Sequence, residues 1–172
     1  MAAIESSRKL LVHKLGAALK MEETTLELLE LLREKASDSR LRLRLQRQHQ
    51  ETQQQIRNLH HAFDALGEKA ESRPSLIVHA LVEERTRMIE RVDDGLVDSV
   101  ILDSVIEAVS HEIAIYNELI INAETIDEED LVPLFQENLE QDEQALDEAN
   151  QERRASLVPA RQAAFVGIEA TA

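Results

Sequence analysis

Apolar residues recur at every third or fourth position through most of the chain, which is the spacing of amphipathic α-helices. Clusters of polar residues, glycine and proline interrupt this pattern and divide the chain into five predicted helices. These helices run over residues 5–36, 38–66, 75–92, 96–123 and 127–152. The third helix is short and the others are long.

Short turns join the long helices into two pairs, and the short helix lies in the longer connection between the pairs. This order predicts an all-α fold, a ferritin-like four-helix bundle with a short extra helix in the crossover between helix 2 and helix 3. We expect this bundle to be one domain over residues 5–152. The pattern decays after Glu152, around Pro159, so residues 153–172 are predicted to form a loosely ordered C-terminal tail.

Local signals refine the helix boundaries. Gly67 is placed to end the second helix, and Asp127, which three further acids follow, is predicted to cap the start of the last helix. Leu41, Leu43 and Leu45 alternate with arginines and mimic a strand over a few residues. The Gln-rich and Glu-rich sequence after them returns to helical spacing, so we predict that this segment is helical.

One acid interrupts or borders the apolar face of each long helix: Glu22, Glu51, Glu112 and Asp142. Two residues that are equidistant from the turn of an antiparallel hairpin lie side by side. Glu22 and Glu51 are equidistant from the turn near residue 37, and Glu112 and Asp142 are equidistant from residue 127. We therefore expect a bundle of the two hairpins to bring four carboxylates into one region of the core.

Burying ionised carboxylates is very costly, so several of them together require cations or protons. Oxygen ligands from four helices suit iron or manganese, and di-metal carboxylate bundles bind two such ions. We predict that the four acids bind a pair of Fe or Mn ions, a site suited to oxidising Fe(II) or consuming peroxide or dioxygen. The Glu-x-x-His pattern of those bundles is missing, because Gln54 and Ala145 stand at the histidine positions. Weaker candidate ligands are His49, Gln54 and Gln55.

An alternative to the metal site stays open at this point. A rotation of the helices would place some of these acids at the edge of the apolar face, where they reach water or pair with Arg and His. The protein would then be a metal-free helical scaffold or a protein-interaction module on the same fold. The second helix also carries a basic face, for which we expect solvation or a contact with the acidic last helix: Arg40, Arg42, Arg44 and Arg47.

Composition narrows the classes of partner. The chain has 34 acidic and 19 basic residues, a net charge of −15, so bare nucleic acid and anionic membranes are poor partners. The acidic stretch from residue 124 to 152 could attract metal cations or a basic partner. The absence of cysteine excludes disulfides and thiolate metal sites and is compatible with a reducing cytoplasm, where we expect the protein. No apolar run is long enough to predict a membrane span.

Five segments occur in a fixed order along the chain: LGAALKMEETTLELL, HQETQQQIRNLHHAFDALG, HALVEE, SHEIAIY and ENLEQDEQAL. In order and pattern they resemble the YciF/YciE-type ferritin-like bacterial stress proteins, long classed as a domain of unknown function, over residues 10–150. The resemblance implies a ferritin-like bundle, a homodimer and an association with bacterial stress responses. It also implies that the four acids named above occupy acidic positions of the family.

Overall fold

The computed structural model describes residues 4–169, and the side chains of residues 4–156. Its α-helices are α1 (Ser7–Lys35), α2 (Ser39–Ala65), α3 (Leu76–Ile89), α4 (Val97–Thr125) and α5 (Val132–Glu169), with the short 3-10 helices η1 (Asp94–Leu96) and η2 (Glu129–Leu131). No strand occurs within these residues, so the all-α prediction is confirmed.

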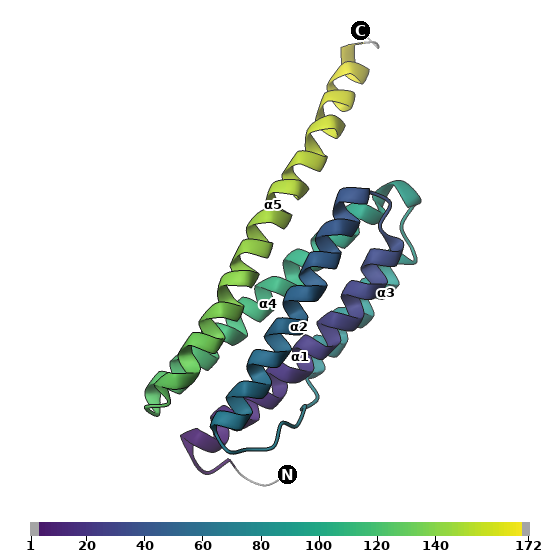
Figure 1. Ribbon diagram of the computed structural model, residues 1–172. Helices are drawn as coiled ribbons and strands as arrows, with labels where there is room; N and C mark the ends of the chain where they lie inside the picture. Colours follow the sequence, from purple (N-terminus) through teal and green to yellow (C-terminus); the bar gives the residue numbers. More distant parts are fainter. Residues whose placement is uncertain (1–3, 170–172) are drawn as a thin grey trace.

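The long helices pack side by side as two antiparallel hairpins (Figure 1). α1 packs against α2, and α4 packs against α5. The hairpins meet where α1 contacts α4 and where α2 contacts α5, and the short α3 lies against α1 and α4. Because α3 lies in the connection from α2 to α4, the crossover covers one side of the packed helices.

Polar side chains define where the first three helices begin. Ser6 accepts a hydrogen bond from the backbone N–H of Lys9 at 3.2 Å, and Asp38 accepts one from Arg40 at 2.6 Å. Ser75 likewise accepts from the backbone N–H of the third helical residue of α3. Each bond satisfies an N–H group that has no partner within the helix, which contributes about 1 kcal/mol.

The leucine alternation near the start of α2 is helical, as predicted. Leu41 and Leu45 are one turn apart and fully buried, whereas Leu43 points outward with 68% of its surface exposed. Arginines occupy the intervening positions on the outer face. The i and i+4 positions therefore decide the burial, and the apparent period of two has no structural consequence.

The apolar interior consists of two separate clusters, one toward each end of the packed helices. One cluster contains residues from the first half of α1, the second half of α2, the second half of α4 and the start of α5, including Leu15, Phe63 and Phe135. The other contains residues from the second half of α1, the first half of α2 and the first half of α4, including Leu45 and Ile101. The buried polar residues other than Ser104 occupy the level between the two clusters.

Two helix ends share one backbone geometry, and this corrects the predicted start of the last helix. At the end of α2 the N–H of Glu68 bonds the carbonyl of Phe63, and Gly67 has φ +66°. At the end of α4 the N–H of Glu128 bonds the carbonyl of Ala123, and Asp127 has φ +60°. Both are Schellman ends with the left-handed residue just past the helix. Asp127 thus ends α4 instead of capping the next helix, and α5 begins only at Val132.

The last helix is also longer than the sequence pattern indicates. We predicted that it ends near Glu152, but α5 continues to Glu169 and projects past the other helices (Figure 1). Part of the predicted tail, residues 153–169, is therefore helical in its backbone. The side chains from residue 157 onward, and all of residues 170–172, lie outside the described residues.

The start of the crossover is fixed against α1 by two hydrogen bonds. The backbone N–H of Arg73 donates to the carbonyl of Gly16 at 2.8 Å, and the hydroxyl of Ser72 donates to Glu23 at 2.6 Å. Gly16 is the position where the loop backbone comes closest. A Cβ at this residue would lie 2.7 Å from the carbonyl oxygen of Glu71. The glycine is therefore required by the close approach of the loop and not by its own backbone conformation.

We expect the Gly16→Ala variant to be less stable than the wild type by about 1–2 kcal/mol. Alanine is favoured over glycine in a helix by about 1 kcal/mol, but here its methyl group would displace the loop backbone at residue 71. Urea unfolding followed by circular dichroism measures the difference. Ala17→Gly, one position along the same helix, is the control for helix propensity alone. A Gly16→Ala variant more stable than the wild type would contradict the expected clash.

Candidate functional site

Between the two apolar clusters lies a layer of buried polar side chains contributed by all four long helices. We call it the polar layer, and its members are each at most 6% exposed: Glu22, Thr25, Gln48, Thr52, Gln55, Asn58, Glu112, Asn138 and Asp142. α1 and α4 supply the two glutamates, and α5 supplies the aspartate. The apolar periodicity of each helix forces these residues inward, because they occupy positions where a hydrophobic residue would otherwise stand.

Two hydrogen bonds connect α1 and α4 within the polar layer. The hydroxyl of Tyr116 donates to Glu22 Oε1 at 2.5 Å, and the hydroxyl of Thr25 donates to Glu112 Oε1 at 2.6 Å. Each helix thus contributes one acid and one hydroxyl. These bonds fix the orientation of both carboxyl groups from the opposite helix.

Amide side chains connect α2 and α5 at the same level. Gln55 Nε2 donates to Asp142 Oδ1 at 2.6 Å, and Asn58 Nδ2 donates to Asn138 Oδ1 at 2.7 Å. Asn138 Nδ2 in turn donates to the backbone carbonyl of Gln55 at 3.3 Å. At this central level, amide hydrogen bonds hold the two hairpins together. Toward the ends of the helices, apolar side chains do so instead.

Burial raises the pKa of all three acids in the polar layer. The pKa of Glu22 lies well above its usual value because of desolvation and because the charges of Glu112 and Asp142 repel its own. Desolvation raises the pKa of Glu112 to about 7, against the opposing effect of the Thr25 hydroxyl. The pKa of Asp142 is likewise raised by desolvation and by Glu112. The three carboxyl groups therefore lie close enough to influence one another, and without a cation each keeps its proton to a higher pH than a solvated acid does.

Two carboxyl oxygens in this layer have no hydrogen-bond partner. They are Glu22 Oε2 and Asp142 Oδ2, and both are inaccessible to solvent. Leaving a buried polar atom unpaired costs about 1–3 kcal/mol. Both atoms belong to hard oxygen donors, which is the donor chemistry that iron, manganese and other divalent cations accept.

The structure places the sequence candidates differently from one another. Glu22, Glu112 and Asp142 lie in the polar layer, but Glu51 is 32% exposed at its edge, with Oε1 3.6 Å from Arg47 Nε. Among the weaker candidates, only Gln55 contacts one of the acids.

The remaining two weaker candidates bind elsewhere. The His49 ring lies 3.2 Å from Glu30 Oε1 on the α1–α2 side. Gln54 Nε2 donates to Asn58, and the side-chain oxygen of Gln54, Oε1, accepts from Arg57. Neither side chain contacts Glu22, Glu112 or Asp142 through any hydrogen bond of the structure.

Within the part of the chain that the structure describes, no three His, Asp or Glu side chains converge into a ready-made metal site. The acids of the polar layer face the hydroxyl and amide donors, and the fourth acid faces Arg47. The chemistry of the donors therefore suits a divalent cation, whereas their arrangement in this structure does not surround one. The four-acid ligand set stays a prediction.

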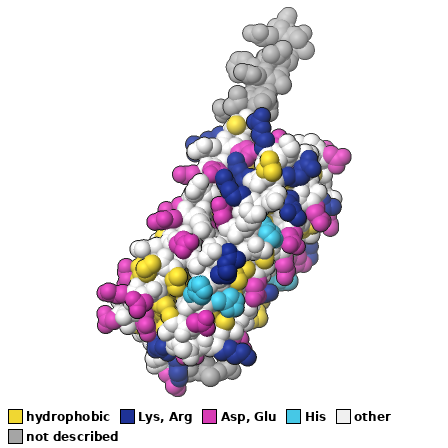
Figure 2. Space-filling view, viewed as in Figure 1, with side chains coloured by type: hydrophobic (Ala, Val, Ile, Leu, Met, Phe, Trp, Pro, Cys, Tyr) yellow, Lys and Arg dark blue, Asp and Glu magenta, His cyan; other side chains and the backbone are white. Residues whose placement is uncertain are grey.

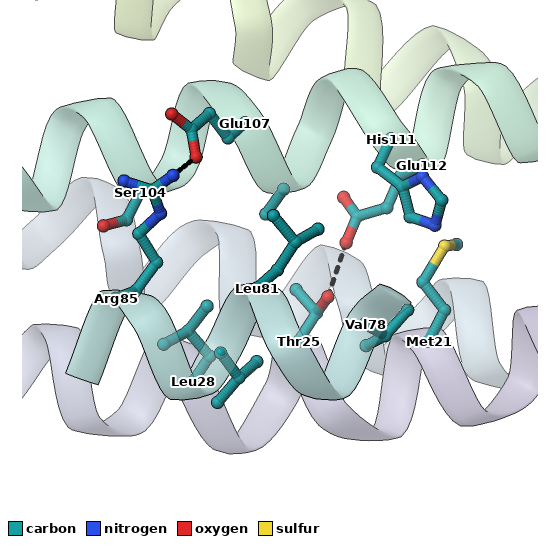
Figure 3. Close-up of a pocket in the computed structure, with 12 residues that line it drawn as sticks. Met21, Thr25, Leu28, Val78, Leu81, Arg85, Ser104, Glu107, His111 and Glu112 are labelled. Carbon is teal, nitrogen blue, oxygen red and sulfur yellow. Dashed lines mark hydrogen bonds and ion pairs between the residues drawn. The ribbon is translucent and has the colours of Figure 1, made fainter. Parts of the chain in front are cut away.

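A small cavity of about 20 Å³ adjoins Glu112 between α1, α3 and α4 (Figure 3). Apolar side chains form most of its wall, including Met21, Leu28 and Val78, and the Thr25–Glu112 hydrogen bond lies at one side. This volume holds about one water molecule. The crossover helix α3 thus separates Glu112 from solvent, and it contributes the Arg85–Glu107 ion pair beside the cavity (Figure 3).

The basic face predicted on α2 contacts the acidic last helix of the same chain. Arg44 pairs with Glu152, and Arg47 pairs with Glu148. Figure 2 shows basic side chains gathered toward the end from which α5 projects, with acids spread over the rest of this face. Much of the predicted basic face is thus neutralised within the chain. No helix in the described part of the chain is long and apolar enough to cross a membrane.

Sequence reasoning did not single out Thr25 or Asn58, which both belong to the polar layer. Each stands one helical turn from a candidate, since Thr25 follows Glu22 by three residues and Asn58 follows Gln55 by three. Residues three apart share a helix face, so this spacing was a usable signal. Tyr116, four residues after Glu112, shares the face of that acid in the same way and supplies the hydroxyl that donates to Glu22.

Solved structures of other proteins share this fold, although no curated protein matches the chain. YcfI from Rhodopseudomonas palustris, to which a structural role is ascribed, has a TM-score of 0.83 at 28% identity, covering 86% of this chain and 94% of that chain. The E. coli stress protein YciF has a TM-score of 0.82 at 19% identity, covering 87% and 95%. Protein XCC3681 from Xanthomonas campestris pv. campestris has a TM-score of 0.73 at 19% identity, covering 95% and 99%.

These likenesses agree with the resemblance to YciF-type proteins found in the sequence. At 19% identity, YciF and XCC3681 establish a shared fold alone. A family model matches residues 6–158, which is most of the chain and includes all four long helices up to the projecting part of α5. The chain therefore belongs to the family described as "Domain of unknown function (DUF892)", to which the resemblance to YciF-type proteins had pointed.

Proposed function

We propose that this protein is a ferritin-like four-helix bundle of a bacterial stress response that binds a pair of Fe or Mn ions in its polar layer. The observation that carries the proposal is the pair of buried, unpartnered carboxyl oxygens on Glu22 and Asp142. Hydrogen-bond donors already satisfy one oxygen of each group, so the free oxygens are available to a cation. A cation would also neutralise the mutual repulsion of three buried acids.

Glu22, Glu112 and Asp142 would hold the ions, with Glu51 as the fourth acid. Bound iron or manganese would supply one-electron redox chemistry and an open coordination position for peroxide or dioxygen. Tyr116, Thr25 and Gln55 orient the three buried carboxyl groups through the hydrogen bonds described above. The apolar clusters on either side exclude water from the layer, which strengthens every electrostatic interaction within it.

Metal analysis of the full chain tests this proposal. We expect protein treated with chelator and then equilibrated with Mn(II), or with Fe(II) without oxygen, to retain up to two ions per chain. Glu22→Gln and Asp142→Asn keep the side-chain shape but remove the charge, so each should lower the affinity for the metal at least tenfold. Glu143→Gln, an exposed acid adjacent to Asp142, is the matched control. A wild type that retains no more metal than Glu22→Gln would refute the metal site.

A second candidate function is a metal-free helical scaffold or interaction module. One observation favours it: the described acids do not converge into a metal-binding group, and Glu51 is paired with Arg47. The structural role ascribed to YcfI is compatible with such a function. A scaffold would show the same thermal midpoint with Mn(II) as with chelator. The homodimer that the resemblance implies stays a prediction, which light scattering of the purified chain measures.

A further inference from the structure

The interface of α2 and α5 has a regular antiparallel register that locates Glu51. Along it, Asn58 contacts Asn138, Gln55 contacts Asp142 and Arg47 contacts Glu148. Glu51 lies midway between Gln55 and Arg47 on α2, so the register places it opposite Ala145 of α5. The side chain of Ala145 is only a methyl group, so α5 presents no bulky side chain opposite the carboxylate of Glu51.

Glu51 lies between two different environments. On one side is the polar layer, whose Asp142 is close enough for the charge of Glu51 to raise its pKa. On the other side are the guanidinium of Arg47, 3.6 Å from Glu51 Oε1, and the carboxylate of Glu148, which Arg47 also contacts. Burial is incomplete, since the Glu51 side chain is 32% exposed and that of Arg47 is 47% exposed. Glu51 therefore lies at the edge of the polar layer, where the guanidinium of Arg47 holds its carboxylate outward.

We propose that Arg47 restrains Glu51 outside the polar layer and competes with the bound cation for this carboxylate. This inference rests on the proposed metal site. Glu51 would turn inward to serve as a fourth oxygen donor to a divalent cation in the polar layer, and Arg47 would keep its ion pair with Glu148. Arg47 is thus a positioning residue that lowers the affinity of the site for metal without contacting the metal.

The restraint that Arg47 places on Glu51 is weak, because both side chains of this ion pair are partly exposed to solvent. An arginine four residues before a glutamate is the less favourable order for a helical ion pair, and an exposed pair of this kind is weak. The intact ion pair should therefore lower the cation affinity of the wild type by a small factor, about fivefold, corresponding to about 1 kcal/mol. The restraint is consequently strong enough to keep Glu51 outward without metal and weak enough for a cation to overcome.

The dissociation constant for Mn(II), measured from the paramagnetic resonance signal of free Mn(II) with the full chain, tests the restraint. We expect Arg47→Met to bind Mn(II) about fivefold more tightly than the wild type, and Arg47→Lys to resemble the wild type because it keeps the charge. Arg44→Met is the matched control, since Arg44 pairs with Glu148 and Glu152 but not with Glu51. That variant should change the affinity less than twofold.

A double-mutant cycle with Glu51→Gln separates the restraint from the general effect of removing a positive charge. In the Glu51→Gln background, Arg47→Met should leave the affinity unchanged. Equal gains from Arg47→Met and Arg44→Met, or a gain that persists in the Glu51→Gln background, would overturn the inference while leaving the metal site intact. If the wild type and every variant fail to bind Mn(II), the metal site itself fails and the inference fails with it.

Discussion

In the presence of chelator, the protein should be more stable at pH 5 than at pH 8, and Glu112 alone should account for about 3 kcal/mol of the difference. Its pKa is about 7 in the folded protein and 4.5 when solvated, so between these values the folded state binds the extra proton. This contribution is fully present below pH 4.5 and is lost as the pH rises through 7. The raised pKa values of Glu22 and Asp142 act in the same direction.

Urea unfolding at a series of pH values, followed by circular dichroism, measures this dependence. Glu112→Gln keeps the acceptor for the Thr25 hydroxyl but cannot ionise, so its stability should fall less between pH 5 and pH 8. Glu124→Gln removes an exposed acid from the same helix and serves as the control for net charge. The expected burial of protonated acids is wrong if wild-type stability is constant, or rises, across this range.

Removing Tyr116 alone from the Glu22–Tyr116 pair should lower the stability, whereas replacing both partners by apolar residues should raise it. Tyr116→Phe leaves Glu22 without a donor in a dry interior, so we expect a loss of about 2 kcal/mol. The double variant Glu22→Leu/Tyr116→Phe replaces both groups by apolar ones of similar size and removes the unpartnered Oε2 atom. It should be more stable than the wild type by about 2 kcal/mol in chelator.

Thermal unfolding of the three proteins, with and without Mn(II), makes this comparison. Each 1 kcal/mol corresponds to about 2–4 °C in a domain of this size. Under the proposed function, saturating Mn(II) stabilises the wild type by about 4 kcal/mol at a thousandfold excess over the dissociation constant and leaves the double variant unchanged. A double variant that is less stable than the wild type in chelator would show that the polar pair contributes net stability.

The sequence predicts much of this fold because the helical periodicity of the chain is nearly uninterrupted. The same periodicity places Glu22, Glu112 and Asp142 inward, since each takes the position of a core residue. Glu51 is different because it lies beside Thr52 at the edge of the apolar face. For a residue at an edge, the side chain turns toward whichever partner is available. That partner is Arg47, one helical turn earlier, and the apolar periodicity alone does not show that Arg47 competes for Glu51.

The boundaries between helices show the second limit of sequence reasoning. The acids after Asp127 match the signals of a helix start, and this led to the predicted cap. The backbone bonds that end α4 instead require a left-handed residue at Asp127, and only then does the chain turn into η2 and α5. One short segment satisfied two rules, and the geometry of the preceding helix decided between them.

The division of the interior into two apolar clusters has a consequence for how the molecule opens. Each long helix runs through both clusters and the polar layer between them, so the two ends share a backbone but have separate hydrophobic cores. Amide hydrogens at either end are then protected by the local core, and the centre is protected by hydrogen bonds and any bound cation. A cation that joins all four helices at this level would act as a cross-link between two ends that have separate hydrophobic cores.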